Sequence, residues 1–101
     1  MAELQIRVPY KAWGDGDAWQ GHDDEIHGDL YQAVEAAGIG STDDPDHWED
    51  YICFYLIGDD VEILLTTARE VLRRRGVLTH ASAMVTDPDA NDLRVGTPMP
   101  L

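Results

Sequence analysis

Basic residues are missing from the middle of this chain: residues 12–68 include no lysine or arginine, but they include fifteen aspartates and glutamates. The other 44 residues carry five acidic and seven basic side chains, so the net charge of −13 comes from this one block. Nucleic acids and anionic membrane surfaces bind clustered positive charge, so we expect neither as a direct partner. A source with a biased composition would make a protein acidic throughout, whereas a block of one sign favours a surface that meets a basic partner.

Cysteine and long apolar runs are also scarce. Cys53 is alone, so no internal disulfide can form, and this fits a reducing compartment. The longest uninterrupted apolar run covers residues 51–57, whereas a membrane-spanning helix needs about 20 apolar residues. The first residues contain no basic segment followed by an apolar one, so we expect no secretory signal and a cytoplasmic protein.

Sequence motifs for catalysis, metals and cofactors are absent as well. There is no glycine-rich phosphate loop, no serine-based nucleophile elbow and no CxxC pair, and we interpret Cys53 as a buried core thiol. His22 and His27 are more widely spaced than the usual zinc ligands. Asp15-Gly16-Asp17 and Asp43-Asp44-Pro45-Asp46 lack the distal glutamate of a calcium loop and are typical of turns. We therefore expect no enzymatic activity, no metal and no cofactor.

The first half of the chain predicts a strand, a helix and a second, short strand. Alternating apolar residues indicate a half-buried strand over residues 4–8, followed by a long loop over residues 11–24. An apolar stripe over residues 26–37 predicts a helix that Asp23 or Asp24 caps and that ends at Gly38. A short strand over residues 39–42 and a turn over residues 43–46 follow.

The second half predicts a strand, a helix and further strands. Residues 51–57 are apolar on both faces, which is typical of a central strand. Asp59 is expected to cap a strongly amphipathic helix that begins at Val61 and stops at Gly76. Residues 78–86 are expected to form a strand, residues 87–92 a turn, and residues 93–95 a last short strand. We assign residues 1–96 to one domain and residues 97–101 to a C-terminal tail.

This order of elements predicts an α+β fold of the ferredoxin-like split βαβ kind, an antiparallel sheet with two helices on one face. The other face must then be polar, or be covered by a partner or a second copy. Because neither face of the strand over residues 51–57 is polar, we expect Tyr51 and Tyr55 to lie partly on the open face. There they would serve a homodimer or a contact with another protein.

Two segments carry a family resemblance. Gly58-Asp59-Asp60-Val61 and Ala68-Arg69-Glu70-Val71-Leu72 resemble segments of small ferredoxin-like proteins of high-GC bacteria. Some proteins of this size and acidity are similar to immunity partners that are encoded beside toxins. The resemblance covers about residues 50–86; it implies a fold more than an activity, and it transfers no site residue.

These observations favour a small non-enzymatic protein that binds and neutralises or regulates a basic protein partner. The acidic block would cover a site for nucleic acid or another anionic substrate, and aromatic side chains would anchor the contact. The alternatives are a small dimeric ferredoxin-like enzyme or ligand- or metal-binding domain, in which His80 or His22 and His27 would act, and a structural subunit of a larger complex. The candidate partner-binding residues are Trp13, Asp15, Asp17, Trp19, Asp43, Asp44, Asp46, Trp48, Tyr51 and Tyr55.

Overall fold

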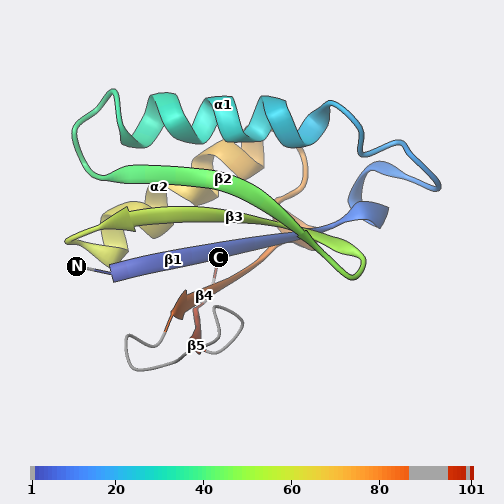
Figure 1. Cartoon of the computed structure of the whole chain (residues 1–101). Coiled ribbons are helices and arrows are strands. Elements are labelled where there is room, and N and C mark those ends of the chain that lie inside the picture. The colour runs from blue at the N-terminus through green and yellow to red at the C-terminus, as the bar shows by residue number, and fades with distance from the viewer. Residues whose placement is uncertain (1, 87–95, 100) are drawn as a thin grey trace.

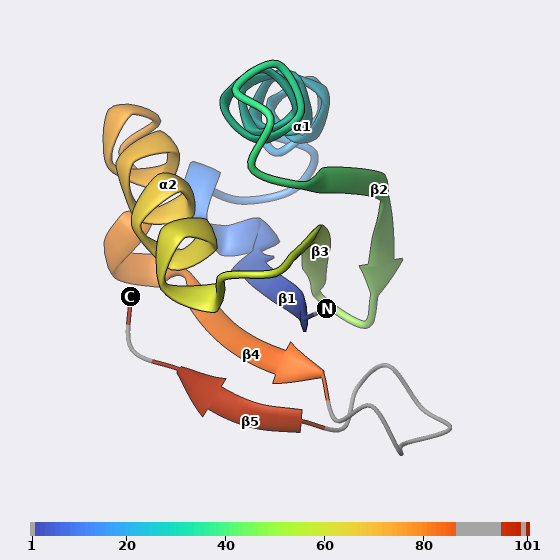
Figure 2. The same cartoon turned by 90° about the vertical axis from the view of Figure 1, so that its left-hand side faces the viewer.

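A five-stranded antiparallel sheet in the order β2-β3-β1-β4-β5 forms the centre of the computed structural model, which describes residues 2–86, 96–99 and 101. Two helices cover one face of this sheet (Figures 1 and 2). The elements are β1 (Ala2–Pro9), α1 (His22–Val34), β2 (Ser41–Trp48), β3 (Tyr51–Gly58), α2 (Val61–Arg74), β4 (Ser82–Thr86) and β5 (Gly96–Met99). The predicted α+β class is confirmed, and the order β2-β3-β1-β4 matches the ferredoxin-like arrangement, which β5 extends beyond β4.

The two central strands bring the apolar residues of the core together. β1 and β3 pair antiparallel with Leu4 opposite Leu56 and Ile6 opposite Phe54, and these four side chains are at most 1% exposed. Successive side chains of a strand point to opposite faces, so the alternate residues of both strands form the face without helices. This face carries Glu3, Gln5 and Arg7 of β1 beside Cys53 and Tyr55 of β3.

Helix α2 forms where its apolar stripe predicts. Its buried side chains repeat at helical spacing, and Asp60, the residue before the helix, accepts hydrogen bonds from the backbone N–H groups of Glu62 and Ile63. The prediction that Asp59 is the cap was therefore wrong by one residue. Gly76, with a φ of 75°, follows the last turn, as a glycine with left-handed geometry commonly does at a helix end.

Helix α1 begins earlier than the sequence suggested. It begins at His22, after Gly21, and Asp23 and Asp24 lie inside its first turn, with no side-chain cap. Neither aspartate is the N-cap, so that prediction was wrong, but both carboxylates lie where the helix dipole favours negative charge. The regular helix ends at Val34, before the predicted stop at Gly38. Neither described helix combines the length and the apolar character that crossing a membrane requires.

Strand β2 is the largest departure from expectation. The segment Asp43-Asp44-Pro45-Asp46, predicted as a turn, lies inside this strand, and the pairing with β3 shifts register between Asp43 and Asp46. Proline and a bulge are tolerated here because β2 is an edge strand. The outward N–H groups of an edge strand have no neighbouring strand to bond, so a residue without an N–H costs no ladder hydrogen bond there. The chain reverses instead at Glu49 and Asp50, and Glu49 takes a φ of 53°.

The C-terminal strands differ from the predicted boundaries as well. Leu78–His80 form a short 3-10 helix, so strand β4 begins only at Ser82. Strand β5 pairs with β4 over Gly96–Met99, so three residues assigned to the tail belong to the sheet. The predicted turn at residues 87–92 and strand at residues 93–95 lie outside the described residues.

Candidate functional site

Three glycines with positive φ angles determine the backbone conformation of the loop between β1 and α1. Gly14, Gly16 and Gly21 have φ angles of 115°, 65° and 89°, a region that side chains with a Cβ rarely adopt. Between these glycines, Asp15 and Asp17 are exposed to solvent, whereas Trp19 is half-buried. The sequence thus encodes a shaped loop that presents two carboxylates and directs one indole towards the protein.

Aromatic and imidazole rings gather beside this loop. The loop lies at the end of the sheet where β1 ends and α1 begins (Figure 1). The Tyr10 and Trp19 rings stack with centroids 4.9 Å apart, and the Trp13 and His22 rings stack at 5.5 Å. The His47 ring lies 5.1 Å from Trp19 and 5.9 Å from Tyr10. We call these five residues the aromatic end. Tyr10, Trp13 and Trp19 also pack against the core, so these rings both close the core and face solvent.

His47 connects three elements at the aromatic end. Its Nδ1 lies 2.8 Å from the Tyr10 hydroxyl, and its Nε2 lies 3.5 Å from a carboxylate oxygen of Asp23 in α1. The backbone N–H of Tyr10 donates to the Asp50 carbonyl at 2.9 Å, which ties the start of the loop to the turn after β2. Burial, together with the negative charges of Asp23 and Asp50, raises the pKa of Tyr10.

Strand β2 carries the second group of predicted site residues. Its carboxylates and those of the following turn are exposed, and we call them the acidic edge: Asp43, Asp44, Asp46, Glu49 and Asp50. The strand leads into the aromatic end through His47, so the acidic edge and the rings are adjacent along the chain. Nothing is described of the side chain of Trp48, so its predicted role stays a prediction.

Two features hinder the pairing of a further strand with β2. The backbone N–H and the hydroxyl of Thr42 both donate to the Glu35 carboxylate, at 3.3 Å and 2.8 Å. Further along, Pro45 has no N–H, and the register shift between Asp43 and Asp46 breaks the ladder. Edge strands protected in this way resist strand addition. A partner would therefore meet the side chains of this edge rather than extend the sheet.

On the face without helices, Gln5 of β1 forms hydrogen bonds with side chains of both neighbouring strands. Gln5 is fully buried; its amide donates to the Thr86 hydroxyl at 2.8 Å, and its carbonyl accepts from the Cys53 thiol at 3.5 Å. Burial raises the pKa of the Cys53 thiol, which opposes formation of the reactive thiolate. Cys53 is a buried thiol, as expected, but it lies opposite the helical core.

The two tyrosines of β3 lie on this face too, where the chain itself covers them. The Arg7 guanidinium lies over the Tyr51 ring, 5.2 Å from its centroid. Tyr55 is only 3% exposed, and its hydroxyl donates to Asp46 at 2.8 Å. Burial, and next this hydrogen bond, raise the pKa of Tyr55. Direct partner contact by the Tyr55 ring is therefore not supported by this conformation, because Tyr55 instead holds a carboxylate of the acidic edge in place.

Basic side chains gather away from the acidic edge, at the end of α2. Arg73 and Arg74 pair with Glu70, and Arg75 pairs with Asp29 and Glu25 of α1. These contacts hold the pKa of Asp29 below its usual value, chiefly through the hydrogen bond from Arg75. None of these four ion pairs includes a carboxylate of β2 or of the loop before α1. The aspartates of those two segments are exposed.

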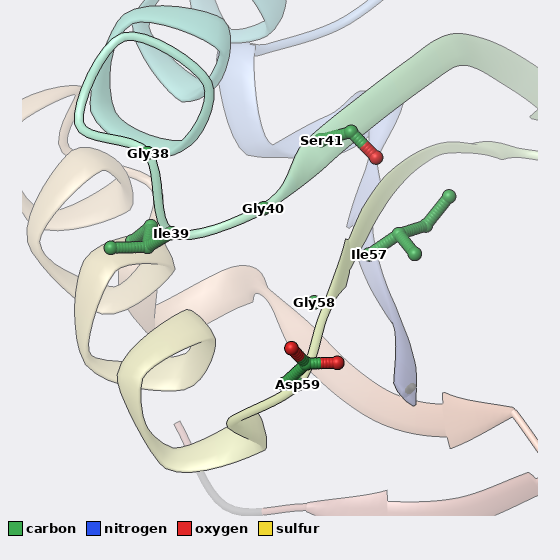
Figure 3. Close-up of a pocket in the computed structure, with 7 residues that line it drawn as sticks. All are labelled: Gly38, Ile39, Gly40, Ser41, Ile57, Gly58 and Asp59. Carbon is green, nitrogen blue, oxygen red and sulfur yellow. The ribbon is translucent and has the colours of Figure 1, made fainter.

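A hollow of about 320 Å³ lies at the opposite end of the sheet, lined by residues 38–41 and 57–59 (Figure 3). Two of the lining residues, Gly40 and Gly58, lie where an added Cβ would meet the backbone of the neighbouring segment. Asp59 brings the only charged side chain among the lining residues. This hollow has no convergent set of polar side chains of the kind that small-molecule sites use. Within the described ranges, no group of three or more His, Cys, Asp and Glu side chains has an arrangement that could hold a metal ion.

Sequence reasoning found part of this site and missed the rest. The structure stacks Trp13 on His22 and Trp19 on Tyr10, and it joins Asp46 to Tyr55. Tyr10 and His47 were missed because they are 37 positions apart, and only the register of β2 on β3 brings them into contact. Neither residue belongs to a local motif, so one sequence offers no signal for the pair.

Comparisons with known proteins give no further assignment: no family model, no curated protein and no solved structure matches this chain.

Proposed function

We propose that this protein is a small non-enzymatic binding module that neutralises or regulates a basic protein partner. The partner's contact surface would be a positively charged site for nucleic acid or another anionic substrate, as in an immunity or inhibitor protein of a bacterial cytoplasm. The observation that carries the proposal is the acidic edge beside the aromatic end, because it combines solvent-facing carboxylates with anchored rings.

Charge and rings would have separate roles in such a contact. Exposed carboxylates of one sign accelerate encounter with a positive surface, and salt screens this attraction within about 8 Å at physiological ionic strength. Half-buried indoles such as those of Trp13 and Trp19 contribute much contact area at low entropic cost, because the loop already positions them. Protein interfaces commonly show this division between a charged rim and an aromatic centre.

Two double variants test the proposal. Asp43→Asn with Asp44→Asn removes two charges from the acidic edge and leaves Asp46, which Tyr55 holds, in place. Asp59→Asn with Glu62→Gln removes the same charge near the start of α2, outside the acidic edge, and serves as the matched control. We would capture partners from the native host at about 0.02 M and about 0.3 M salt, a range over which surface electrostatics weaken strongly.

We expect one stoichiometric basic protein that the wild type and the control retain at low salt and that the acidic-edge variant loses. Equal loss in both variants would show that net charge alone matters and would contradict a defined site. An acidic captured partner would refute the proposal outright.

A further inference from the structure

Tyr10, His47 and Asp23 form a chain of hydroxyl, imidazole and carboxylate from three different elements. The Tyr10 hydroxyl lies 2.8 Å from His47 Nδ1, and His47 Nε2 lies 3.5 Å from Asp23. In a neutral imidazole with its proton on Nε2, Nδ1 accepts the hydrogen bond from the Tyr10 hydroxyl, and the Nε2 proton is on the side of the Asp23 carboxylate. A nucleophile in contact with a base that a third group orients is the arrangement that activates hydroxyl groups in covalent catalysis.

We propose that the Tyr10 hydroxyl is an activated nucleophile that accepts an acyl group from an activated ester, with His47 as its base. The Tyr10 oxygen attacks the acyl carbon and its proton passes to His47 Nδ1. The bond from the acyl carbon to the leaving group then breaks, the electron pair departs with the leaving group, and the imidazolium returns the proton to it. The product is an O-acyl tyrosine formed once per chain, so this inference does not depend on the proposed partner.

The surroundings of Tyr10 make a base necessary and hold it in position. Burial, Asp23 and Asp50 raise the pKa of Tyr10, so its hydroxyl keeps its proton at neutral pH and reacts only if a neighbour accepts that proton. The Trp19 ring stacks on Tyr10 and contacts His47, which fixes both rings relative to each other. The side chain of His47 is 39% exposed, so a small ester can reach the pair from solvent.

Tyr31 on α1 provides an internal reference. It is 47% exposed, whereas Tyr55 is buried and Tyr51 lies beneath Arg7. If exposure alone governed reactivity, Tyr31 would be acylated at least as fast as the half-buried Tyr10. We would treat the intact protein with p-nitrophenyl acetate at neutral pH and follow acetylation of each tyrosine by peptide mass spectrometry.

We expect Tyr10 to be acetylated about 100-fold faster than Tyr31, the lower end of what a positioned base supplies. His47→Gln should reduce the Tyr10 rate to that of Tyr31 and leave Tyr31 unchanged. Asp23 is a positioning residue in this scheme, so Asp23→Asn should slow Tyr10, and Asp23→Glu should restore part of the rate.

Circular dichroism would show whether each variant is folded. Equal rates for Tyr10 and Tyr31 in the wild type would overturn the proposal, and this comparison needs no variant. Fast acetylation of Tyr10 that persists in folded His47→Gln would overturn it too, because the reactivity would then not come from the imidazole.

Discussion

Replacement of Gly40 by alanine should destabilise the protein far more than an ordinary surface substitution. Gly40 precedes β2, where the backbone passes close to the end of β3. An added Cβ would lie 2.1 Å from the Ile57 carbonyl oxygen and 3.1 Å from the carbonyl carbon, whereas ordinary contacts are 3.4–4 Å. The obstacle is backbone rather than the end of a flexible side chain, so β2 itself must move away.

The size of the effect follows from that movement. A shift of more than an ångström is large against a strand spacing of about 4.8 Å, so the first hydrogen bonds of the ladder, near Ser41 opposite Ile57, would be lost or lengthened. Each lost bond costs about 0.5–1.5 kcal/mol, and overpacking adds about 1–3 kcal/mol. We therefore expect a loss of about 2–4 kcal/mol, which corresponds to a fall in Tm of about 10–25 °C for a domain of this size.

Urea unfolding followed by circular dichroism would measure the free energy of unfolding. Gly28→Ala is the matched control, because among the described residues nothing lies within 4 Å of the Cβ added in the middle of α1. This control should stabilise the protein by about 0.5–1 kcal/mol, the helix preference of alanine over glycine. If Gly40→Ala unfolded within about 0.5 kcal/mol of the wild type, the tight packing between β2 and β3 would be refuted.

Three further substitutions test the polar contacts. Tyr55→Phe removes the donor to Asp46 and should lower the free energy of unfolding by about 1 kcal/mol, and an unchanged urea midpoint would contradict this. Burial, and then Asp43, raise the pKa of Glu3, so the contribution of Glu3 to stability falls as the pH rises through its native pKa. Glu3→Gln should therefore stabilise by a few tenths of a kcal/mol at pH 7 and have no effect at about pH 3, as paired urea titrations would show. Arg75 lowers the pKa of Asp29, so Asp29 stabilises the fold above its unfolded pKa and loses this effect as the pH falls through the lower native pKa. Asp29→Asn should lower the thermal midpoint at pH 7 but not at about pH 2, and equal shifts at both values would contradict the ion pair.

The sequence predicted the elements whose own residues determine them. The strand at residues 51–57 is apolar on both faces, and a segment of this kind is stable only in the middle of a sheet. The stripe of α2 repeats at helical spacing through Leu64, Ala68 and Leu72, so its place on the core followed directly. The predicted class and topology depended on these elements, and they were confirmed.

The predictions that failed concern segments whose structure depends on contacts with a neighbouring strand. Three aspartates and a proline have low strand preference, yet β2 forms because the free edge of β3 supplies its hydrogen bonds. Tyr51 and Tyr55 lie on the face without helices, as predicted, but the contacts of Tyr51 with Arg7 and of Tyr55 with Asp46 depend on how the strands pair. The contact between Tyr10 and His47 was missed for the same reason, since it exists only after β2 and β3 have paired. Composition and periodicity are local quantities, and they contain no information about these partners.

The acidic residues of β2 reconcile the fold with the proposed binding role. An exposed edge strand of eight residues would ordinarily template further strands, whereas like charges and a bulge oppose pairing with another copy. Under the proposed function, the same carboxylates would attract a basic surface, so one set of side chains would disfavour self-association and favour the partner. Asp46 belongs both to the packing of the fold and to the acidic edge, because the buried Tyr55 holds its carboxylate while the residue itself stays exposed. A rigid charge loses less entropy on binding than a mobile one. Under the proposed function, Tyr55→Phe should therefore weaken partner binding even though Tyr55 itself is buried.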